Sequence, residues 1–220
     1  MAPAGDITGT ITLKGAPPAE KVITPLKDDP QCGKLHTETP TTHFYVVGAG
    51  GELADAVVAL QNISGKSTGA SAEPVVLDQK GCEYVPSILA IQTGQKLLVK
   101  NSDPVLHNVH TRPTVDGNKE ANPAQMPNGP DLTFTFAKPE MFLKFQCDVH
   151  PWMFAWVSVF DHPYFAVSGK DGKYTIKNVP DGKYTLAVYH RKAAPVASPV
   201  TAEIEVKGGN VTKDFTLEAK

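Results

Sequence analysis

Apolar and polar residues alternate with a period of two along most of the chain, which is the pattern of strands that bury one face. No segment of a dozen residues carries an apolar stripe with the 3.6-residue period of a helix. We therefore expect an all-β fold. The expected strands are 7–13, 43–47, 56–60, 75–77, 88–91, 96–100, 132–136, 141–145, 154–160, 172–176, 183–189, 202–206 and 211–217.

Two stretches interrupt this alternation. Residues 16–40 are rich in proline and charge, which predicts a long connecting segment with no core of its own. Residues 112–130 show little apolar periodicity and are expected to be loop. Short helical turns are compatible with the pattern in 16–31 or 112–130.

The last sixty residues have a character of their own. From Gly172 to Val188 they follow the pattern G-x-Y-x-I-x-x-V-P-x-G-x-Y-x-L-x-V. This pattern resembles the carboxypeptidase regulatory-like, or prealbumin-like, β-sandwich modules, whose opening strand often reads G-x-I-x-G-x-V. Gly5 to Ile11 is similar to that strand. The resemblance implies a second small β-sandwich domain at 161–220, completed by strand 5–15; alternatively, strand 5–15 simply opens the first domain.

Charge and hydropathy limit the class of protein. With 21 Lys and Arg against 23 Asp and Glu, the net charge is -2, whereas binding to nucleic acid phosphates needs a basic surface. No apolar run approaches the roughly 18 residues of a membrane span. The opening residues also lack the basic and apolar regions of a signal peptide, although an exported protein whose signal has been removed would look the same.

One heptapeptide carries most of the chemical information. Cys147, His150 and Met153 present a thiolate, an imidazole and a thioether at the spacing C-x2-H-x2-M, directly after an expected strand. Thiolate and thioether are soft donors that favour copper, and a Cys with two His and a weak axial Met defines the blue-copper site. The segment 101–110, which follows the expected strand 96–100 and contains His107 and His110, supplies the second imidazole.

These two motifs make the stretch from about 88 to 160 resemble a cupredoxin, most closely the amicyanin and pseudoazurin type. His107-Asn108-Val109 matches the first ligand motif, with Leu106 in place of the usual proline. The second motif departs from the family at Asp148-Val149, where Thr-Pro is usual, and at Trp152, where Phe is usual. The resemblance implies a Greek-key β-sandwich at 41–160 and one mononuclear type 1 copper. The implied ligands are His107, Cys147, His150 and Met153, and Asn108 is implied to brace the ligand loop.

The function implied by the resemblance is that of a periplasmic electron carrier with a redox partner protein such as a cytochrome or an oxidoreductase, and not that of an enzyme. A copper carrier or sensor without redox cycling remains the alternative. Zinc suits a Cys and two His as well, although a thioether is an unusual zinc ligand. A β protein of structural or carbohydrate-binding function, without metal, is disfavoured only by the ligand motifs.

Three further residues, His110, His162 and Met126, are candidates for a position near the metal, with surface or packing roles as the favoured alternative. His36, His43 and His190 show no partner pattern and are expected at the surface.

With Cys147 assigned to copper, Cys32 and Cys82 remain as one even pair. A disulfide between them fits an exported protein in an oxidising compartment; two free thiols are the alternative. In cupredoxins the His on the C-terminal ligand loop, which corresponds to His150 here, usually reaches the surface through an apolar patch. Trp152 either belongs to such a docking patch beside His150 or packs inward as core.

Overall fold

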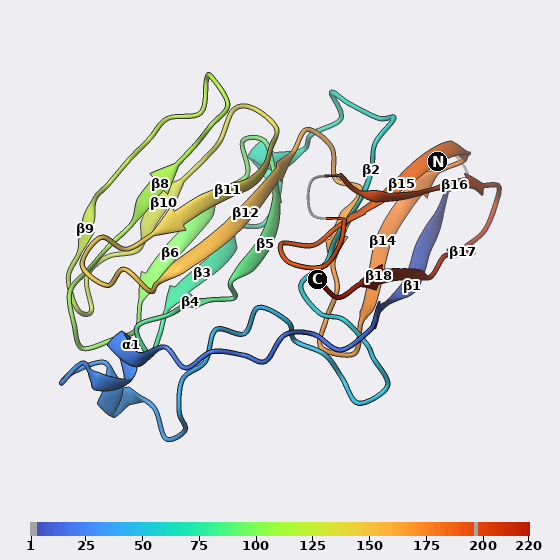
Figure 1. Ribbon diagram of the computed structural model, residues 1–220. Coiled ribbons are helices and arrows are strands. Elements are labelled where there is room, and N and C mark those ends of the chain that lie inside the picture. Colours follow the sequence, from blue (N-terminus) through green and yellow to red (C-terminus); the bar gives the residue numbers. More distant parts are fainter. Residues whose placement is uncertain (1–3, 196–197) are drawn as a thin grey trace. The chain divides into compact units, whose positions relative to one another are not determined.

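The computed structural model describes residues 4–195 and 198–220, and Figure 1 shows the course of the chain. The chain divides into two compact units. Unit 1 comprises Met1–Glu20, His43–Gly65 and Tyr164–Lys220, and unit 2 comprises Lys21–Thr42 and Lys66–Pro163. Strands dominate both units, so the predicted all-β class is confirmed. The described helices are α1 (Thr24–Asp28) and the 3-10 turns η1 (Gly33–Leu35) and η2 (Gly69–Ser71).

Unit 2 contains two four-stranded sheets. One has the order β10-β6-β3-β4 and the other has the order β5-β12-β11-β8, while β7 and β9 form a separate two-stranded pair. The strands are β3 (Val75–Gln79), β4 (Tyr84–Val85), β5 (Ile88–Gln92), β6 (Leu97–Asn101), β7 (His107–Asn108), β8 (His110–Arg112), β9 (Ala124–Gln125), β10 (Leu132–Phe134), β11 (Glu140–Gln146) and β12 (Phe154–Phe160).

The two sheets of unit 2 form a sandwich because each has one apolar face. Leu77 and Val99 from the first sheet share a continuous core with Phe145 and Val157 from the second. All four side chains are fully buried. Cys147 and Met153 belong to the same core, so the candidate ligand loop is anchored directly in the sandwich interior.

Unit 1 is a second sandwich with its own core. Its strands are β1 (Ala4–Lys14), β2 (Val57–Leu60), β13 (Phe165–Val167), β14 (Lys173–Pro180), β15 (Gly182–Tyr189), β16 (Val200–Val206), β17 (Val211–Thr212) and β18 (Phe215–Glu218). One sheet has the order β14-β1-β17 with β18 also paired to β1, and the other has the order β13-β2-β15-β16. Burial along β1 alternates residue by residue, which is why its sequence shows period two.

β1 pairs antiparallel with β14 and parallel with β17 and β18. A side chain at Gly9 would meet the backbone oxygen of Lys213 at 1.9 Å. Only glycine therefore permits the close approach between β1 and the C-terminal segment. The strand at 5–15 thus joins the sheet built from the last sixty residues, and the resemblance of this unit to carboxypeptidase regulatory-like modules stays a prediction.

The division of the chain differs from the expected boundaries 41–160, 161–220 and 16–40. Residues 43–65 belong to unit 1 because β2 lies between β13 and β15 in its sheet, with all four residues buried. Residues 21–42 belong to unit 2, where Leu26 and Cys32 enter the core, so this segment is more than a connection. The expected strand at 43–47 is replaced by an isolated bridge between Val47 and Leu53.

The described part of the chain contains no helix long and apolar enough to cross a membrane.

Candidate metal centre

The ends of three strands bring the candidate ligands together at one edge of unit 2. β6 runs into the loop that delivers His107, which begins β7. β11 ends directly before Cys147, and β12 begins directly after Met153. Since β11 and β12 are antiparallel neighbours, residues 147–153 form the connection of a hairpin. The backbone N–H of Cys147 donates to the carbonyl of Met153 at 3.2 Å, and that of Met153 donates to the carbonyl of His150 at 2.9 Å.

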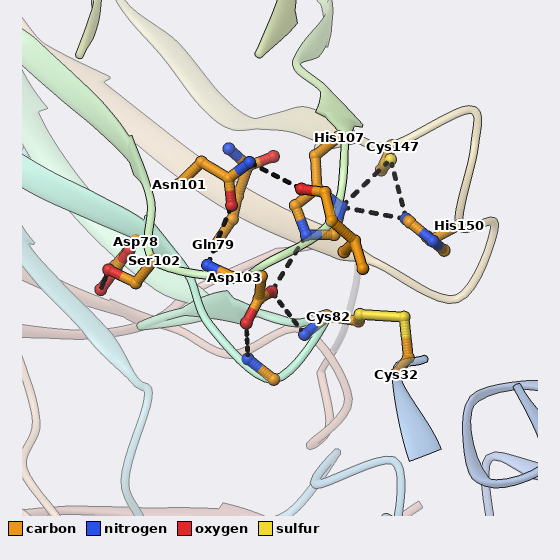
Figure 2. A network of polar contacts seen from close by, with 12 residues as sticks. Cys32, Asp78, Gln79, Cys82, Asn101, Ser102, Asp103, His107, Cys147 and His150 are labelled. Atoms are coloured by element: carbon orange, nitrogen blue, oxygen red, sulfur yellow. Dashed lines mark hydrogen bonds and ion pairs between the residues drawn. A yellow bond between two sulfur atoms is a disulfide. The ribbon is translucent and has the colours of Figure 1, made fainter. Parts of the chain in front are cut away.

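Three donor atoms converge where this loop meets His107, as Figure 2 shows. Nδ1 of His107 lies 2.9 Å from Nδ1 of His150. Sγ of Cys147 lies 3.9 Å from the first of these nitrogens and 3.7 Å from the second. The structure therefore brings together three of the four ligands expected from the sequence.

The size of this triangle suits a metal ion. A point equidistant from the three donor atoms lies about 2.1 Å from each of them, close to the metal–nitrogen and metal–sulfur distances of about 2.0–2.3 Å found at protein sites. His107 is fully buried, Cys147 is 1% exposed and His150 is 8% exposed. The donor set thus fits a single ion that is shielded from solvent.

Met153, the fourth expected ligand, is buried in the same core. Its backbone N–H donates to the carbonyl of His150 and its carbonyl accepts from the N–H of Cys147, so the loop that carries the other two donors is closed at Met153. The thioether is softer than the donors that a zinc site normally uses.

Asn108 braces the ligand loop by accepting hydrogen bonds. Its Oδ1 accepts from the backbone N–H of Asp148 at 2.7 Å and from that of Val149 at 3.3 Å. The thiol of Cys147 also donates to this oxygen, at 3.3 Å. Asn108 directly follows His107. This dipeptide therefore provides one donor nitrogen and also supports the loop that provides the donor atoms of Cys147 and His150.

Asp103 holds the outer nitrogen of His107. Its Oδ2 lies 3.0 Å from Nε2 of His107 and accepts the backbone N–H of Cys82 at 2.7 Å, while Oδ1 accepts that of Gly81 at 2.6 Å. The carboxylate is 3% exposed. A carboxylate on the far nitrogen fixes the ring orientation and increases the basicity of a ligating histidine. Asp103 was not among the site residues expected from the sequence, although an acidic residue four positions before a candidate ligand is a usable signal.

Electrostatics at the site favour a thiolate. Burial is the largest influence on Cys147 and opposes ionisation, yet hydrogen bonds from His107 and from nearby backbone groups outweigh it and lower the pKa of the thiol. Burial likewise opposes charge on His107, but the hydrogen bonds to Asp103 and Cys147 raise its pKa. Burial and the charge of His107 lower the pKa of His150. A metal ion needs the deprotonated sulfur, so this environment assists binding.

His110 and His162 lie outside the triangle. Nδ1 of His110 lies 2.7 Å from Asp148 and its Nε2 lies 2.7 Å from Glu120, so both of its ring nitrogens face carboxylates. His110 thereby ties the ligand loop to the loop before β9. His162 is buried against Phe160.

Of the remaining residues expected at the surface, some are exposed and others are buried. Met126 is 61% exposed and His43 is exposed, as expected. His36 is half-buried, with Nε2 2.7 Å from the carbonyl of Gly81. The surface assignment of His190 is wrong: it is buried, its Nδ1 accepts two backbone N–H groups, and its ring packs against Tyr45 in unit 1.

The structure contains the expected disulfide between Cys32 and Cys82 and leaves Cys147 free. Trp152 is half-buried beside the bridge: its indole N–H donates to the carbonyl of Cys82 at 3.1 Å, and its ring centroid lies 5.3 Å from that of His150. Of the two alternatives for Trp152, the inward-packed one describes this arrangement.

No protein-family model matches the chain, and no curated protein matches it either. Among solved structures, a copper-containing nitrite reductase from Thermus scotoductus SA-01 is 22% identical over 46% of this chain and 25% of its own, with a TM-score of 0.36. A Cu(I) variant of amicyanin is 21% identical over 46% of this chain and 97% of its own, with a TM-score of 0.35. A purple cupredoxin from Nitrosopumilus maritimus is 25% identical over 39% and 98%, with a TM-score of 0.32.

The chain thus spans about a quarter of the length of the nitrite reductase. All three TM-scores lie between 0.32 and 0.36.

Proposed function

We propose that this chain is a mononuclear copper protein that transfers single electrons, with His107, Cys147, His150 and Met153 as the ligands. The observation that carries the proposal is the convergence of two imidazole nitrogens and one sulfur on a buried point. The disulfide between Cys32 and Cys82 supports an exported, periplasmic location, because disulfides persist in oxidising compartments.

The donor set supports copper over zinc. A thiolate with two imidazoles and a thioether is the soft, trigonal set that suits both Cu(I) and Cu(II). Copper bound there would supply a one-electron couple. Structural zinc sites take four Cys or His ligands, whereas the fourth candidate here is a methionine.

The chain's own residues do three things for such a centre. Asp103 and Asn108 orient the imidazole of His107 and the loop of Cys147 before any ion is present. The sandwich core excludes water from Cys147 and Met153. The hairpin between β11 and β12 fixes the spacing of the loop donors. Ligands held in this way move little between two oxidation states, which is what fast electron transfer requires.

We also propose a protein redox partner that docks beside the centre. Leu106 directly precedes His107, Val149 lies within the ligand loop, and Met126 follows Gln125, which pairs with His107. These three side chains are 37%, 49% and 61% exposed. Exposed apolar side chains that gather near a functional group commonly mark an interaction surface, and transient redox complexes use small interfaces.

The decisive experiment is a visible absorption spectrum of the protein titrated with Cu(II). One equivalent should produce an intense sulfur-to-copper charge-transfer band, and Cys147→Ser should abolish it. Met153→Leu should keep the band but shift the reduction potential, because the axial thioether is the weaker contact. A colourless one-to-one complex, or a Cys147→Ser protein that keeps the band, would contradict the proposal.

The second candidate function is a copper carrier or sensor that does not cycle between oxidation states. The burial of the donor set favours it as well, since both functions require retention of the ion. Cyclic voltammetry separates the two: reversible one-electron waves support the electron carrier, whereas tight Cu(I) binding without a reversible wave supports the carrier or sensor.

A further inference from the structure

The segment Lys21–Thr42, which we name the cover, is a closed loop attached to unit 2. Its two ends are joined by hydrogen bonds from Ile23 to Pro40 at 3.0 Å and from Thr42 to Lys21 at 3.0 Å. α1 and η1 lie within it. Closing its ends in this way makes the cover a structure of defined shape rather than an open connection.

The cover is attached to the sandwich by apolar packing of Leu26 and Ile23, by a disulfide and by a hydrogen bond. Leu26 of α1 is fully buried in the core of unit 2. Cys32 forms the disulfide with Cys82, and both cysteines have zero exposure. His36 contacts the carbonyl of Gly81, the residue before Cys82. The cover is therefore bound to the core and to the turn between β3 and β4.

The folding of the cover brings Cys32 to its partner. Oδ1 of Asp29 accepts the backbone N–H groups of Gln31 and Cys32 at 2.9 and 2.8 Å. A side chain at Gly33 would meet the backbone oxygen of Lys27 at 2.3 Å, so the turn into η1 requires glycine. This tight turn directs Cys32 inward.

The bridge lies directly against a candidate ligand. Both bridge sulfurs and one ring nitrogen of His150 lie within 4.8 Å of one another. Figure 2 shows the bridge beside His150, with Cys82 connected to Asp103, which holds His107. His150 is the most exposed of the four candidate ligands, yet it retains only 8% exposure.

We infer that the cover closes the candidate metal centre on the side of His150, so that His150 meets exogenous ligands or reagents only when the cover opens. The cover is then a specificity-determining segment: it limits the centre to reactions in which no outside ligand binds the ion. The part of this inference that concerns the ion rests on the proposed function.

The test measures the access of a reagent to His150 in the metal-free protein, with His43 as the internal standard. Diethyl pyrocarbonate modifies accessible imidazoles, and peptide mass spectrometry reports the rate at each histidine. His43 is exposed in unit 1, so its rate should be the same in every variant. In the unaltered protein His150 should react far more slowly than His43.

Two variants open the cover in different ways. Cys32→Ser combined with Cys82→Ser removes the bridge, and Leu26→Ala removes the fully buried core contact of the cover while keeping the bridge and the partly buried Ile23. Each should raise the ratio of the His150 rate to the His43 rate by roughly tenfold or more, because buried groups react through local opening. Leu97→Ala is the matched control: Leu97 is equally buried in the same core but starts β6, at the opposite end of that strand from the ligand loop.

If the double serine variant does not fold, Leu26→Ala against Leu97→Ala still decides the question. The inference is overturned if His150 reacts as fast as His43 in the unaltered protein, or if neither cover variant changes the ratio beyond the Leu97→Ala value.

A second measurement monitors copper release to excess EDTA from protein loaded with Cu(II). Release should accelerate in both cover variants and not in Leu97→Ala; equal rates in all of them would contradict the part of the inference that concerns the ion. Failure of every variant and of the unaltered protein to bind copper would instead refute the proposed function, while the reactivity of His150 would still decide whether the cover shields it.

Discussion

Asp103 lies four residues before His107, and its carboxylate oxygen is 3.0 Å from Nε2 of that histidine, while Nδ1 of the same ring faces Cys147 and His150. A buried negative charge is thereby placed one imidazole away from the candidate ion. We expect Asp103→Asn to raise the reduction potential, since an anion stabilises Cu(II) more than Cu(I). Cu(II) affinity should fall about 10- to 100-fold, as for other carboxylates that hold a ligating histidine.

Protein-film voltammetry and competition with a Cu(II) chelator measure these two effects. Asp116→Asn, which removes an exposed carboxylate in the loop after β8, is the control and should leave both values unchanged. A potential that falls, or that moves equally in the control, would contradict the role of Asp103.

Asn108 should stabilise the folded protein as well as the site. Asn108→Ala leaves the backbone N–H groups of Asp148 and Val149 without their acceptor. Because both residues are exposed and water can replace the acceptor, the loss should be about 1 kcal/mol, the net value of a hydrogen bond. Urea unfolding of the metal-free protein measures the free energy of unfolding. Asn122→Ala removes a contact to the Asn108 side chain but no acceptor of these N–H groups, so it should cost clearly less; equal losses would argue against the bracing role.

Trp152 should behave as a structural residue. Trp152→Ala should lower the free energy of unfolding by roughly 2 kcal/mol, below the 3–5 kcal/mol of fully buried aromatic residues, because the indole is half-buried. Trp152→Phe should cost about 1 kcal/mol, the value of the hydrogen bond to Cys82. If Trp152→Ala instead leaves stability unchanged and slows only electron exchange with a partner protein, Trp152 belongs to a docking surface.

The Cys32–Cys82 bridge should contribute substantially to stability. It closes a loop with a sequence separation of 50, for which the loss of chain entropy in the unfolded state corresponds to about 4 kcal/mol. The free energy of unfolding of the Cys32→Ser and Cys82→Ser double variant, compared with the unaltered protein, measures this. Alkylation of the unfolded, unreduced protein should label Cys147 alone; labelling of all three cysteines would show that the bridge is absent.

His190 should make the stability of unit 1 depend on pH. Burial lowers its pKa to about 4, below the value of about 6.5 in an unfolded chain. The unfolded state therefore binds the proton more readily, so the stabilisation is present above about pH 6.5 and is lost as the pH falls toward 4. The full effect is roughly 3 kcal/mol from the difference in pKa.

Thermal unfolding between pH 4 and 7.5, measured for the unaltered protein and for His190→Gln, tests this. The substitution should flatten the decline below pH 6.5 because it removes the titrating group. An identical decline in both proteins would assign the pH dependence to other residues.

Most of the strands and most of the ligand set can be predicted from local sequence pattern. Alternation of apolar residues in β1, β11 and β12 arises because one face of each strand is buried, and burial of alternate side chains is a local property of an extended chain. Cys147, His150 and Met153 are close in sequence, so a single short loop brings them near one another whatever the rest of the fold does. His107 could be identified because the sequence His107-Asn108-Val109, which follows the end of β6, resembles the first ligand motif of the cupredoxins.

Features that depend on contacts between distant segments are visible only in the folded protein. β2 reads as a strand, but only the packing of its four buried residues between β13 and β15 assigns it to unit 1. From its sequence the proline-rich cover is expected to be a connecting segment, because its buried residues, Leu26 and Cys32, do not form a periodic apolar pattern. Asp103 orients His107 because it also accepts hydrogen bonds from Gly81 and Cys82, which are distant in sequence. The burial of His190 likewise cannot be predicted from the residues next to it in sequence. Burial of one residue by others far along the chain has no local pattern, and for that reason only the folded structure shows it.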